Sequence, residues 1–171
     1  KHPKETLIVV TADHETGGIA LGTGKYALNL KALENQKASA EVLSKKISDL
    51  RKAKNNHVAW EDIKNLLSEE MGFWSVLPIT WEQEKKLRDE YEKSFVRNKV
   101  EFAESMYAKT EPMAAKAKEV MDQIAMVGWT SGGHSAGYVP VFAIGAGSDL
   151  FIGKMDNTEI PKRIAKAGGY K

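Results

Sequence analysis

The sequence has no cysteine among its 171 residues, which excludes disulfides and thiolate metal sites and leaves the cellular compartment open. No apolar run is long enough to cross a membrane, and no signal-peptide pattern is present, so no membrane partner is predicted. The 25 basic residues are spread among 23 acidic ones without a basic stripe, and this argues against nucleic-acid binding.

What is present is typical of a globular protein, with 42% hydrophobic and 28% charged residues. The length suits one ordinary domain. The chain begins Lys1-His2-Pro3, without methionine, and enters an apolar strand almost at once. Such a strand needs neighbours that the sequence hardly offers. We therefore expect a carboxyl-terminal fragment of a longer protein, with a complete domain as the alternative.

That first strand, Leu7 to Val10, is short, wholly apolar and rich in β-branched residues, so we expect it to be buried on both faces. It leads into Asp13-His14 and then into Gly17-Gly18, whose backbone freedom lets the strand end there. A carboxylate beside an imidazole suits a divalent metal, zinc above all. The ordinary alternative is an aspartate that only hydrogen-bonds loop amides.

The middle of the chain, residues 28–126, has helical periodicity and almost no glycine. We expect four helices, each marked by a stripe of apolar residues. The four stripes are Ala40, Leu43, Ile47 and Leu50; Trp60, Ile63, Leu66 and Leu67; Leu87, Tyr91, Phe95, Phe102 and Met106; and Met113, Ala117, Val120, Met121 and Ile124. Thr80 with Gln83 predicts a capping box, and Pro112 suits a first helical turn.

These stripes are expected to form a core rather than a cofactor pocket, because no convergent polar groups accompany them. The apolar connector 73–79 lacks a helical period. We expect it to pack onto a missing part of the protein, with burial beneath the helices as the alternative.

A second segment that could contribute to a functional site runs from Gly128 to Gly145. His134 lies between Gly132-Gly133 and Gly137, which allow close backbone approach, and it precedes a second apolar strand, Val139 to Ile144. Each of the two strands has a ligand-type side chain beside it. We therefore expect the strands to belong to one sheet, whose ends bring these side chains together in one site. A final helix is expected at about 159–167, ending at Gly168-Gly169.

Taken together and in this order, these motifs closely resemble alkaline phosphatases. The segments that carry the resemblance are Thr11 to Gly18, Gly132 to Ser135, Val139 to Ala143, Gly145 to Gly147 and Asp156 to Ile160. The resemblance implies an α/β fold, here a carboxyl-terminal fragment of an alkaline-phosphatase-like sandwich with a few sheet strands and a largely helical insertion. Residues 1–171 would be a partial phosphatase domain, and 28–126 an insertion within it.

The resemblance also implies a chemistry, namely hydrolysis of a phosphomonoester through a phosphoserine intermediate. Asp13 and His14 match ligands of the zinc ion nearest the serine, and His134 matches a ligand of the second zinc. The nucleophilic serine, the remaining zinc carboxylates and the Mg²⁺ ligands have no counterpart in this chain. The isolated fragment is therefore expected to be inactive.

Partners and location are implied in the same way. The missing amino-terminal portion of the same protein would be a partner, the full-length protein could form a homodimer, and the family is commonly periplasmic or extracellular. The alternatives are a related phosphoglycerate mutase or phosphodiesterase, or a non-catalytic helical interaction module. Ser131 and Ser135 are interpreted as turn residues, and His2 and His57 as residues without a metal role.

Overall fold

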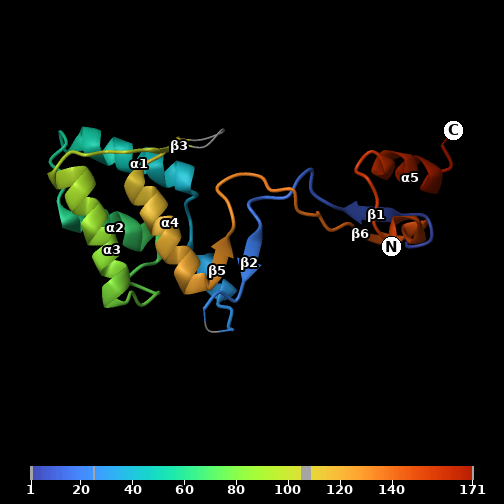
Figure 1. The fold of residues 1–171 in the computed structure, drawn as a ribbon, viewed down its shortest axis with the longest axis horizontal. Helices are drawn as coiled ribbons and strands as arrows, with labels where there is room; N and C mark the ends of the chain where they lie inside the picture. Colours follow the sequence, from blue (N-terminus) through green and yellow to red (C-terminus); the bar gives the residue numbers. More distant parts are fainter. Residues whose placement is uncertain (1, 25, 105–108, 171) are drawn as a thin grey trace. The chain divides into compact units, whose positions relative to one another are not determined.

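The computed structural model describes residues 2–24, 26–104 and 109–170. The chain divides into two compact units (Figure 1). The terminal unit contains Lys1–Gly18 and His134–Lys171, and the helical unit contains Ile19–Gly133. Within the described ranges, every helix is too short or too polar to span a bilayer.

The terminal unit is built on a two-stranded antiparallel ribbon, β1 (Leu7–Val10) with β6 (Phe142–Gly145). In its register Ile8 lies opposite Ile144 and Val10 lies opposite Phe142. The chain then forms the 3-10 helix η3 (Ser148–Phe151) and the helix α5 (Glu159–Ala167). At the end of β6, Gly145 has a φ of 102°, and a Cβ there would lie 2.0 Å from the Thr6 carbonyl oxygen. Only glycine fits this position.

The expectation that Leu7 to Val10 is buried on both faces is wrong for the described chain. Leu7 and Val9 are half-buried, whereas Ile8 and Val10 are exposed. Strand side chains alternate between the two faces of a sheet, and α5 and η3 lie on the side of Leu7 and Val9. Nothing within the described residues covers the other side.

The helical unit begins and ends with a second antiparallel pair, β2 (Ile19–Leu21) and β5 (Val127–Trp129). Between them lie the 3-10 helix η1 (Leu30–Asn35), the helices α1 (Ala40–Ala53), α2 (Trp60–Met71) and α3 (Trp81–Tyr91), and the π-helical turn η2 (Glu92–Val96). They are followed by a short pair, β3 (Ala103–Glu104) with β4 (Lys109–Thr110), and by α4 (Pro112–Ala125). The predicted helices 1, 2 and 4 and the final helix are confirmed.

Local sequence sets the helix boundaries. The Thr80 hydroxyl accepts a hydrogen bond from the Gln83 amide, and the Gln83 side chain accepts one from the Thr80 amide, so the predicted capping box is confirmed. Pro112 occupies the first turn of α4, where its missing N–H is tolerated. Helix α2 ends at Gly72, which has a φ of 71° in the left-handed region.

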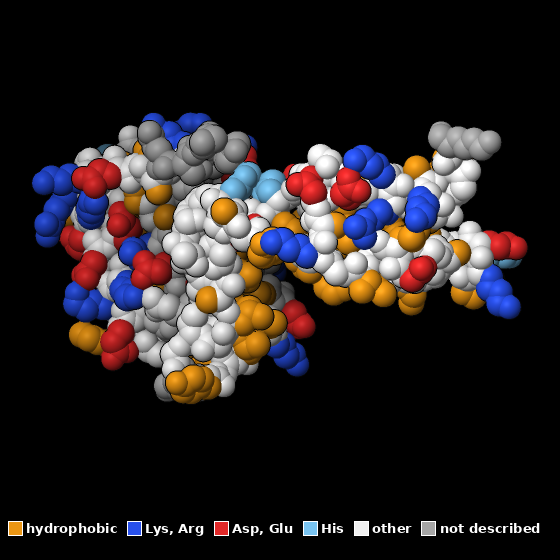
Figure 2. All heavy atoms as spheres, turned by 45° about the vertical axis from the view of Figure 1, so that its right-hand side comes forward, with side chains coloured by type: hydrophobic (Ala, Val, Ile, Leu, Met, Phe, Trp, Pro, Cys, Tyr) orange, Lys and Arg blue, Asp and Glu red, His pale blue; other side chains and the backbone are white. Residues whose placement is uncertain are grey.

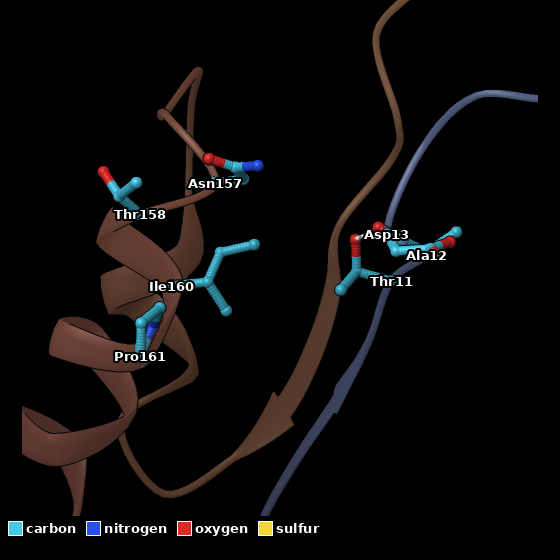
Figure 3. A pocket seen from close by; sticks show the side chains of 7 residues that line it. All are labelled: Thr11, Ala12, Asp13, Asn157, Thr158, Ile160 and Pro161. Atoms are coloured by element: carbon cyan, nitrogen blue, oxygen red, sulfur yellow. Dashed lines mark hydrogen bonds between the residues drawn. The ribbon is translucent and has the colours of Figure 1, made fainter. Parts of the chain in front are cut away.

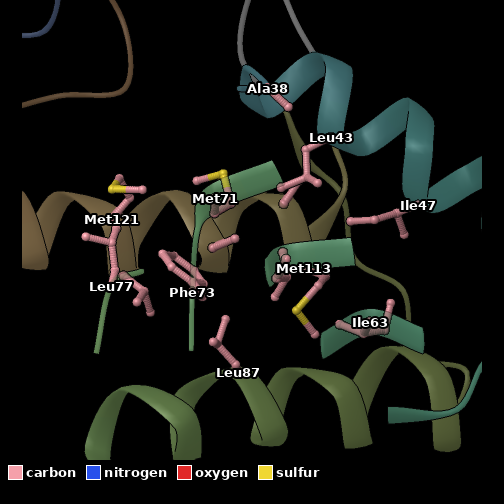
Figure 4. Close-up of a cluster of buried hydrophobic side chains, with 14 of the residues drawn as sticks. Ala38, Leu43, Ile47, Ile63, Met71, Phe73, Leu77, Leu87, Met113 and Met121 are labelled. Atoms are coloured by element: carbon pink, nitrogen blue, oxygen red, sulfur yellow. The ribbon is translucent and has the colours of Figure 1, made fainter. Parts of the chain in front are cut away.

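The predicted apolar stripes meet in one core at the centre of the helical unit (Figure 4). Its fully buried side chains include Leu43, Ile47, Ile63, Leu67, Phe73, Leu87, Met113, Val120 and Met121. The connector 73–79 belongs to this core, because Phe73 and Leu77 are buried and Trp74 and Ile79 pack against it. The expectation that it packs elsewhere is wrong; of its apolar side chains, only Val76 and Pro78 are exposed.

The third predicted helix is shorter than its stripe suggests. After α3 the backbone forms one π-type turn, and it leaves the helix at Asn98, whose φ of 53° is left-handed. Tyr91 and Phe95 stay in the core and stack with ring centroids 5.4 Å apart, whereas Phe102 lies outside the helix and is exposed. Met106, the last member of the predicted stripe, lies outside the described residues. That 28–126 is an insertion within a phosphatase domain stays a prediction.

Candidate metal site at the strand ends

Asp13 and His14 follow β1 in the terminal unit and lie at the surface. The backbone amide of His14 donates a hydrogen bond of 3.0 Å to Oδ1 of Asp13. This bond turns the second carboxylate oxygen toward the neighbouring ring, and Oδ2 lies 3.6 Å from Nε2 of His14. Although they are sequence neighbours, the two side chains therefore present one oxygen and one nitrogen to the same space, because the strand has already ended.

The hydrogen bond that Nδ1 of His14 makes shows which ring nitrogen carries a proton. Nδ1 lies 2.8 Å from the carbonyl oxygen of Glu15. A carbonyl can only accept, so Nδ1 carries a proton, and Nε2 is the ring nitrogen that faces Asp13. A hydrogen bond from the second ring nitrogen to a carbonyl is the usual way in which proteins orient a metal-binding histidine.

His134 lies directly beside this pair. Its ring stacks on that of His14 with centroids 3.5 Å apart and an interplanar angle of 22°. The strand partners explain the meeting, because β1 runs into Asp13-His14 while the antiparallel β6 is entered from the His134 side. A hydrogen bond of 3.2 Å from Thr11 Oγ1 to the Pro140 carbonyl joins the two segments. The three side chains singled out in the sequence are thus brought together in the terminal unit.

Glu15 holds the two segments in place, a role that the sequence reasoning missed. Its carboxylate accepts a 2.8 Å hydrogen bond from the Ser135 amide, a second bond from the Ser135 hydroxyl and a third from the Gly18 amide. The Ser135 hydroxyl, followed by the Gly18 amide, holds the pKa of the Glu15 carboxyl below its usual range. The sequence pattern that could have indicated this role is a glutamate directly after the Asp-His pair and shortly before two glycines.

An open pocket of about 480 Å³ borders Asp13 (Figure 3). Thr11, Ala12 and Asp13 lie on one side of it, and the residues at the start of α5 lie on the other. Asp156 orders that second wall, because its Oδ1 accepts hydrogen bonds from the amide and the hydroxyl of Thr158. Asp156 thus acts as a turn residue before α5.

The donor set fits part of a zinc site. Two ligand atoms bound to one tetrahedral zinc ion lie about 3.3–3.6 Å apart, and the Asp13–His14 separation agrees with this. Residues 2–24, 26–104 and 109–170 nevertheless contain no group of three or more His, Cys, Asp or Glu side chains that could hold a metal ion. His14 and His134 also lie face to face, an arrangement that suits ligands of two neighbouring ions better than ligands of one.

Of the remaining candidates, Ser131, His57 and His2 make local contacts, whereas Ser135 also contacts a distant segment. Ser131 Oγ donates to the Gly133 carbonyl, whereas Ser135 binds Glu15 across 120 positions of sequence, which is more than a turn role. His57 Nδ1 lies 2.9 Å from the Asn55 carbonyl oxygen, and His2 Nδ1 lies 3.5 Å from the Glu5 carboxylate. Both contacts are local, joining residues two or three positions apart in the sequence.

Fold and site together define a mixed α/β partial domain, mostly helical, with an Asp-His-His group at the end of a short ribbon. The profile of the alkaline phosphatase family matches residues 1–170. The chain belongs to the alkaline phosphatase family.

Individual relatives agree with this assignment. "Alkaline phosphatase 3" of Bacillus subtilis (strain 168) is 31% identical over 181 residues, covering 99% of this chain and 32% of the relative. "Alkaline phosphatase 4" of the same organism is 26% identical, covering 97% and 30%. The crystal structure of a cold-active alkaline phosphatase from the psychrophile Shewanella sp. superposes with a TM-score of 0.62 at 25% identity, covering 98% of this chain and 35% of that one. The chain thus spans about a third of the length of these relatives.

Proposed function

We propose that this chain is the carboxyl-terminal portion of a metal-dependent phosphomonoester hydrolase and supplies Asp13, His14 and His134 as zinc ligands. The observation that carries the proposal is the meeting of the His14 and His134 rings, 3.5 Å apart, in a chain of the alkaline phosphatase family. Asp13 with His14 would serve one ion and His134 a second. The nucleophilic serine, the other zinc ligands and the Mg²⁺ ligands would come from the rest of the polypeptide.

The chemistry of such a site is that of a two-metal clamp. Bound zinc would polarise phosphoryl oxygens and lower the pKa of a bound water toward about 7. This chain's own residues would orient the side chains that bind the metal ions. The Glu15 carbonyl fixes the proton of His14 on Nδ1, and the Glu15 carboxylate holds the Ser135 segment, and with it His134, against the Asp13-His14 pair. By family resemblance, we extend the proposal to an exported protein that could be homodimeric.

The test is a full-length chimera in which this chain replaces the matched third of Bacillus subtilis alkaline phosphatase 3. Loaded with zinc and magnesium, it should hydrolyse p-nitrophenyl phosphate. Asp13→Asn, His14→Ala and His134→Ala should each lower kcat/KM by at least about 100-fold, while His57→Ala, outside the terminal unit, should leave it unchanged. A folded chimera that cleaves only bis(p-nitrophenyl) phosphate would favour a phosphodiesterase, and an inactive one would contradict the proposal.

The isolated chain gives a complementary test. Without the nucleophile it should show no turnover, and it should not hold two zinc ions tightly. Robust hydrolysis of p-nitrophenyl phosphate by the pure 171-residue chain, lost in His134→Ala, would show that this part of the proposal is wrong.

A further inference from the structure

A lysine and a tyrosine meet in another hollow of the terminal unit. The hollow has a volume of about 320 Å³ and lies between residues 138–141, which lead into β6, and residues 153–155, which precede α5. The Lys154 ammonium donates a hydrogen bond to the Tyr138 hydroxyl and lies 4.4 Å from the centroid of the Tyr138 ring. We call these two residues the Lys-Tyr pair.

Lys154 differs from most cations of this chain in its partner. Lys45, Lys86 and Lys162, for example, each contact a carboxylate. Among the described residues no carboxylate pairs with Lys154, whose polar partner there is the Tyr138 hydroxyl alone. An ammonium group has three N–H donors, so two donors of Lys154 remain for a ligand. Basic side chains are spread over the visible surface of the terminal unit (Figure 2), and it is the partner, not the charge, that sets Lys154 apart.

The tyrosine holds this ammonium group in place. The face of an aromatic ring attracts a cation, and the hydroxyl adds a hydrogen bond to the same side chain. Two contacts with one partner restrict the flexible lysine before any ligand arrives, so less conformational entropy is lost when an anion binds. The loop that carries Lys154 turns at Gly153, whose φ of 88° is in the left-handed region.

The Lys-Tyr pair is connected to the candidate metal site. Gly137, which precedes Tyr138, lies so close to Glu15 that a Cβ there would be 3.0 Å from Cγ of Glu15. The Gly137 amide also donates to the Ser135 hydroxyl, which in turn donates to the Glu15 carboxylate. Because Glu15 follows His14 directly, the backbone that leads to Tyr138 lies beside the metal-site segment.

The strand register supports the same placement. Just beyond the last pair of the β1–β6 ladder, the Thr11 hydroxyl donates a hydrogen bond of 3.2 Å to the Pro140 carbonyl. Asp13 and Tyr138 each lie two residues from this contact, at most about 7 Å along each segment. The segments belong to antiparallel strands, so Asp13 and Tyr138 lie at the same end of the ribbon. A small ester bound at Asp13 through its phosphoryl group would extend toward the Lys-Tyr pair.

We propose that the Lys-Tyr pair is a subsite for the alcohol portion of the substrate and favours phosphomonoesters whose alcohol portion carries a second anionic group. The proposal rests on the proposed function, because the metal site is what binds the scissile phosphoryl group. The Lys154 ammonium would bind the remote anion through charge-assisted hydrogen bonds, and the Tyr138 ring would contact the carbon skeleton.

The anion site is tested first without catalysis. The 171-residue chain is titrated with benzoate in the presence of EDTA and followed by amide NMR. Benzoate should shift the signals of Tyr138 and Gly153 saturably, whereas neutral benzamide should not. Lys154→Gln should remove the saturable shift, Lys154→Arg should retain it, and Lys162→Gln, in the same unit but paired with Glu159, should not affect it. No saturable shift in the unmodified chain, or the same shift in Lys154→Gln, would overturn the proposal.

The substrate role is tested in the chimera with Bacillus subtilis alkaline phosphatase 3. The readout is kcat/KM for p-carboxyphenyl phosphate divided by kcat/KM for phenyl phosphate, two esters that differ only in the remote carboxylate. Lys154→Gln should lower this ratio about tenfold, as expected for the loss of one charge-assisted hydrogen bond. Lys154→Arg should keep most of the ratio, Tyr138→Ala should lower it in part, and Lys162→Gln should leave it unchanged.

The two measurements separate the subsite from the proposed function. An unchanged ratio for Lys154→Gln in an active chimera would overturn the role of the Lys-Tyr pair in substrate selection. Saturable benzoate binding together with a folded but inactive chimera would leave the anion site intact and count against the proposed function alone. The titration needs no chimera, so it decides by itself whether the anion site is present.

Discussion

The carboxylate of Glu15 accepts hydrogen bonds from both the amide and the hydroxyl of Ser135, a residue 120 positions later in the sequence. Through this contact the segment that carries His134 is held against the segment that carries Asp13 and His14. The two halves of the candidate site are thus joined by a carboxylate that belongs to none of the three candidate ligands.

Removal of this carboxylate should weaken metal binding without removing a ligand. Glu15→Ala should lower the zinc affinity of the full-length chimera described above by about 10-fold or more, as loss of a residue that positions ligands commonly does. Zinc affinity is measured by competition with a chromophoric chelator. Glu5→Ala, an exposed glutamate of the same unit, is the control and should change nothing. Equal affinities for the two variants would show that Glu15 does not position the site.

The helical unit is tied together by a buried ion pair between α1 and the start of α4. Arg51 Nη2 lies 2.9 Å from Glu111 Oε1, and the side chains are 15% and 3% exposed. The same guanidinium donates to the Ser94 carbonyl and lies 3.6 Å from the centroid of the Phe95 ring. Arg51→Ala should lower the free energy of unfolding by about 3–5 kcal/mol, because Glu111 is left buried without its cation.

Urea unfolding monitored by tryptophan fluorescence is suited to this measurement, because all four tryptophans lie in the helical unit. The neighbouring variant Lys52→Ala removes a cation that is 77% exposed and should change stability by less than about 0.5 kcal/mol. A similarly small effect for Arg51→Ala would mean that the ion pair is not important for stability.

The connector between α2 and α3 offers a second matched pair. Phe73 is fully buried, whereas Val76, three residues later, is 66% exposed. Phe73→Ala should cost about 3–5 kcal/mol through lost burial and the cavity left behind, and Val76→Ala should stay within about 0.5 kcal/mol. The same fluorescence-monitored unfolding measures both. Comparable costs at the two positions would contradict the burial of this connector.

Glu119 on α4 should make the helical unit sensitive to acid. A hydrogen bond from Lys116, at 2.6 Å, and one from Lys86, at 2.9 Å, hold the pKa of its carboxyl below the ordinary value of 4.5. A carboxyl whose pKa is lower in the folded state stabilises that state above the ordinary value, and it loses this contribution as the pH falls through the lowered one.

Between pH 6 and pH 3, the urea midpoint of the unmodified chain should therefore fall more than that of Glu119→Gln, with Glu69→Gln, an exposed glutamate, as the control. The difference should be small and should shrink in high salt, because the Glu119 side chain is 43% exposed. A pH dependence that is identical in all three proteins would show that the Lys–Glu119 contacts carry no net stabilisation.

The helices could be predicted from the sequence because their information is local. A stripe such as Ala40, Leu43, Ile47 and Leu50 has helical spacing, which predicts a helix with one buried face. The capping box at Thr80 marks the start of a helix. The end of the third helix was not predictable from its stripe, because Phe102 continues the period after Asn98 has already turned the backbone. The burial of Phe73 could not be predicted either, because the connector has no helical or strand period that would indicate which of its side chains are buried.

The sequence suggested which residues are candidate ligands but not how they are arranged, and their role as ligands stays a prediction. Residue types and glycine contexts selected Asp13, His14 and His134, whereas the pairing of β1 with β6 and the role of Glu15 depend on contacts across more than a hundred positions. The expectation of a strand covered on both faces failed for a related reason. Apolar composition predicts that a strand can be buried, and it does not say which polypeptide does the burying.

The pairing of β2 with β5 places the entry and the exit of the helical unit next to each other, with Ile19 opposite Trp129. Neighbouring strands lie about 4.8 Å apart, a gap that a two-residue hairpin turn can close. In topological terms the helical unit is one long loop between the two halves of the candidate site. A shortened chain with a tight turn between Leu21 and Val127 would keep the β2–β5 pairing and would still join Gly18 to His134.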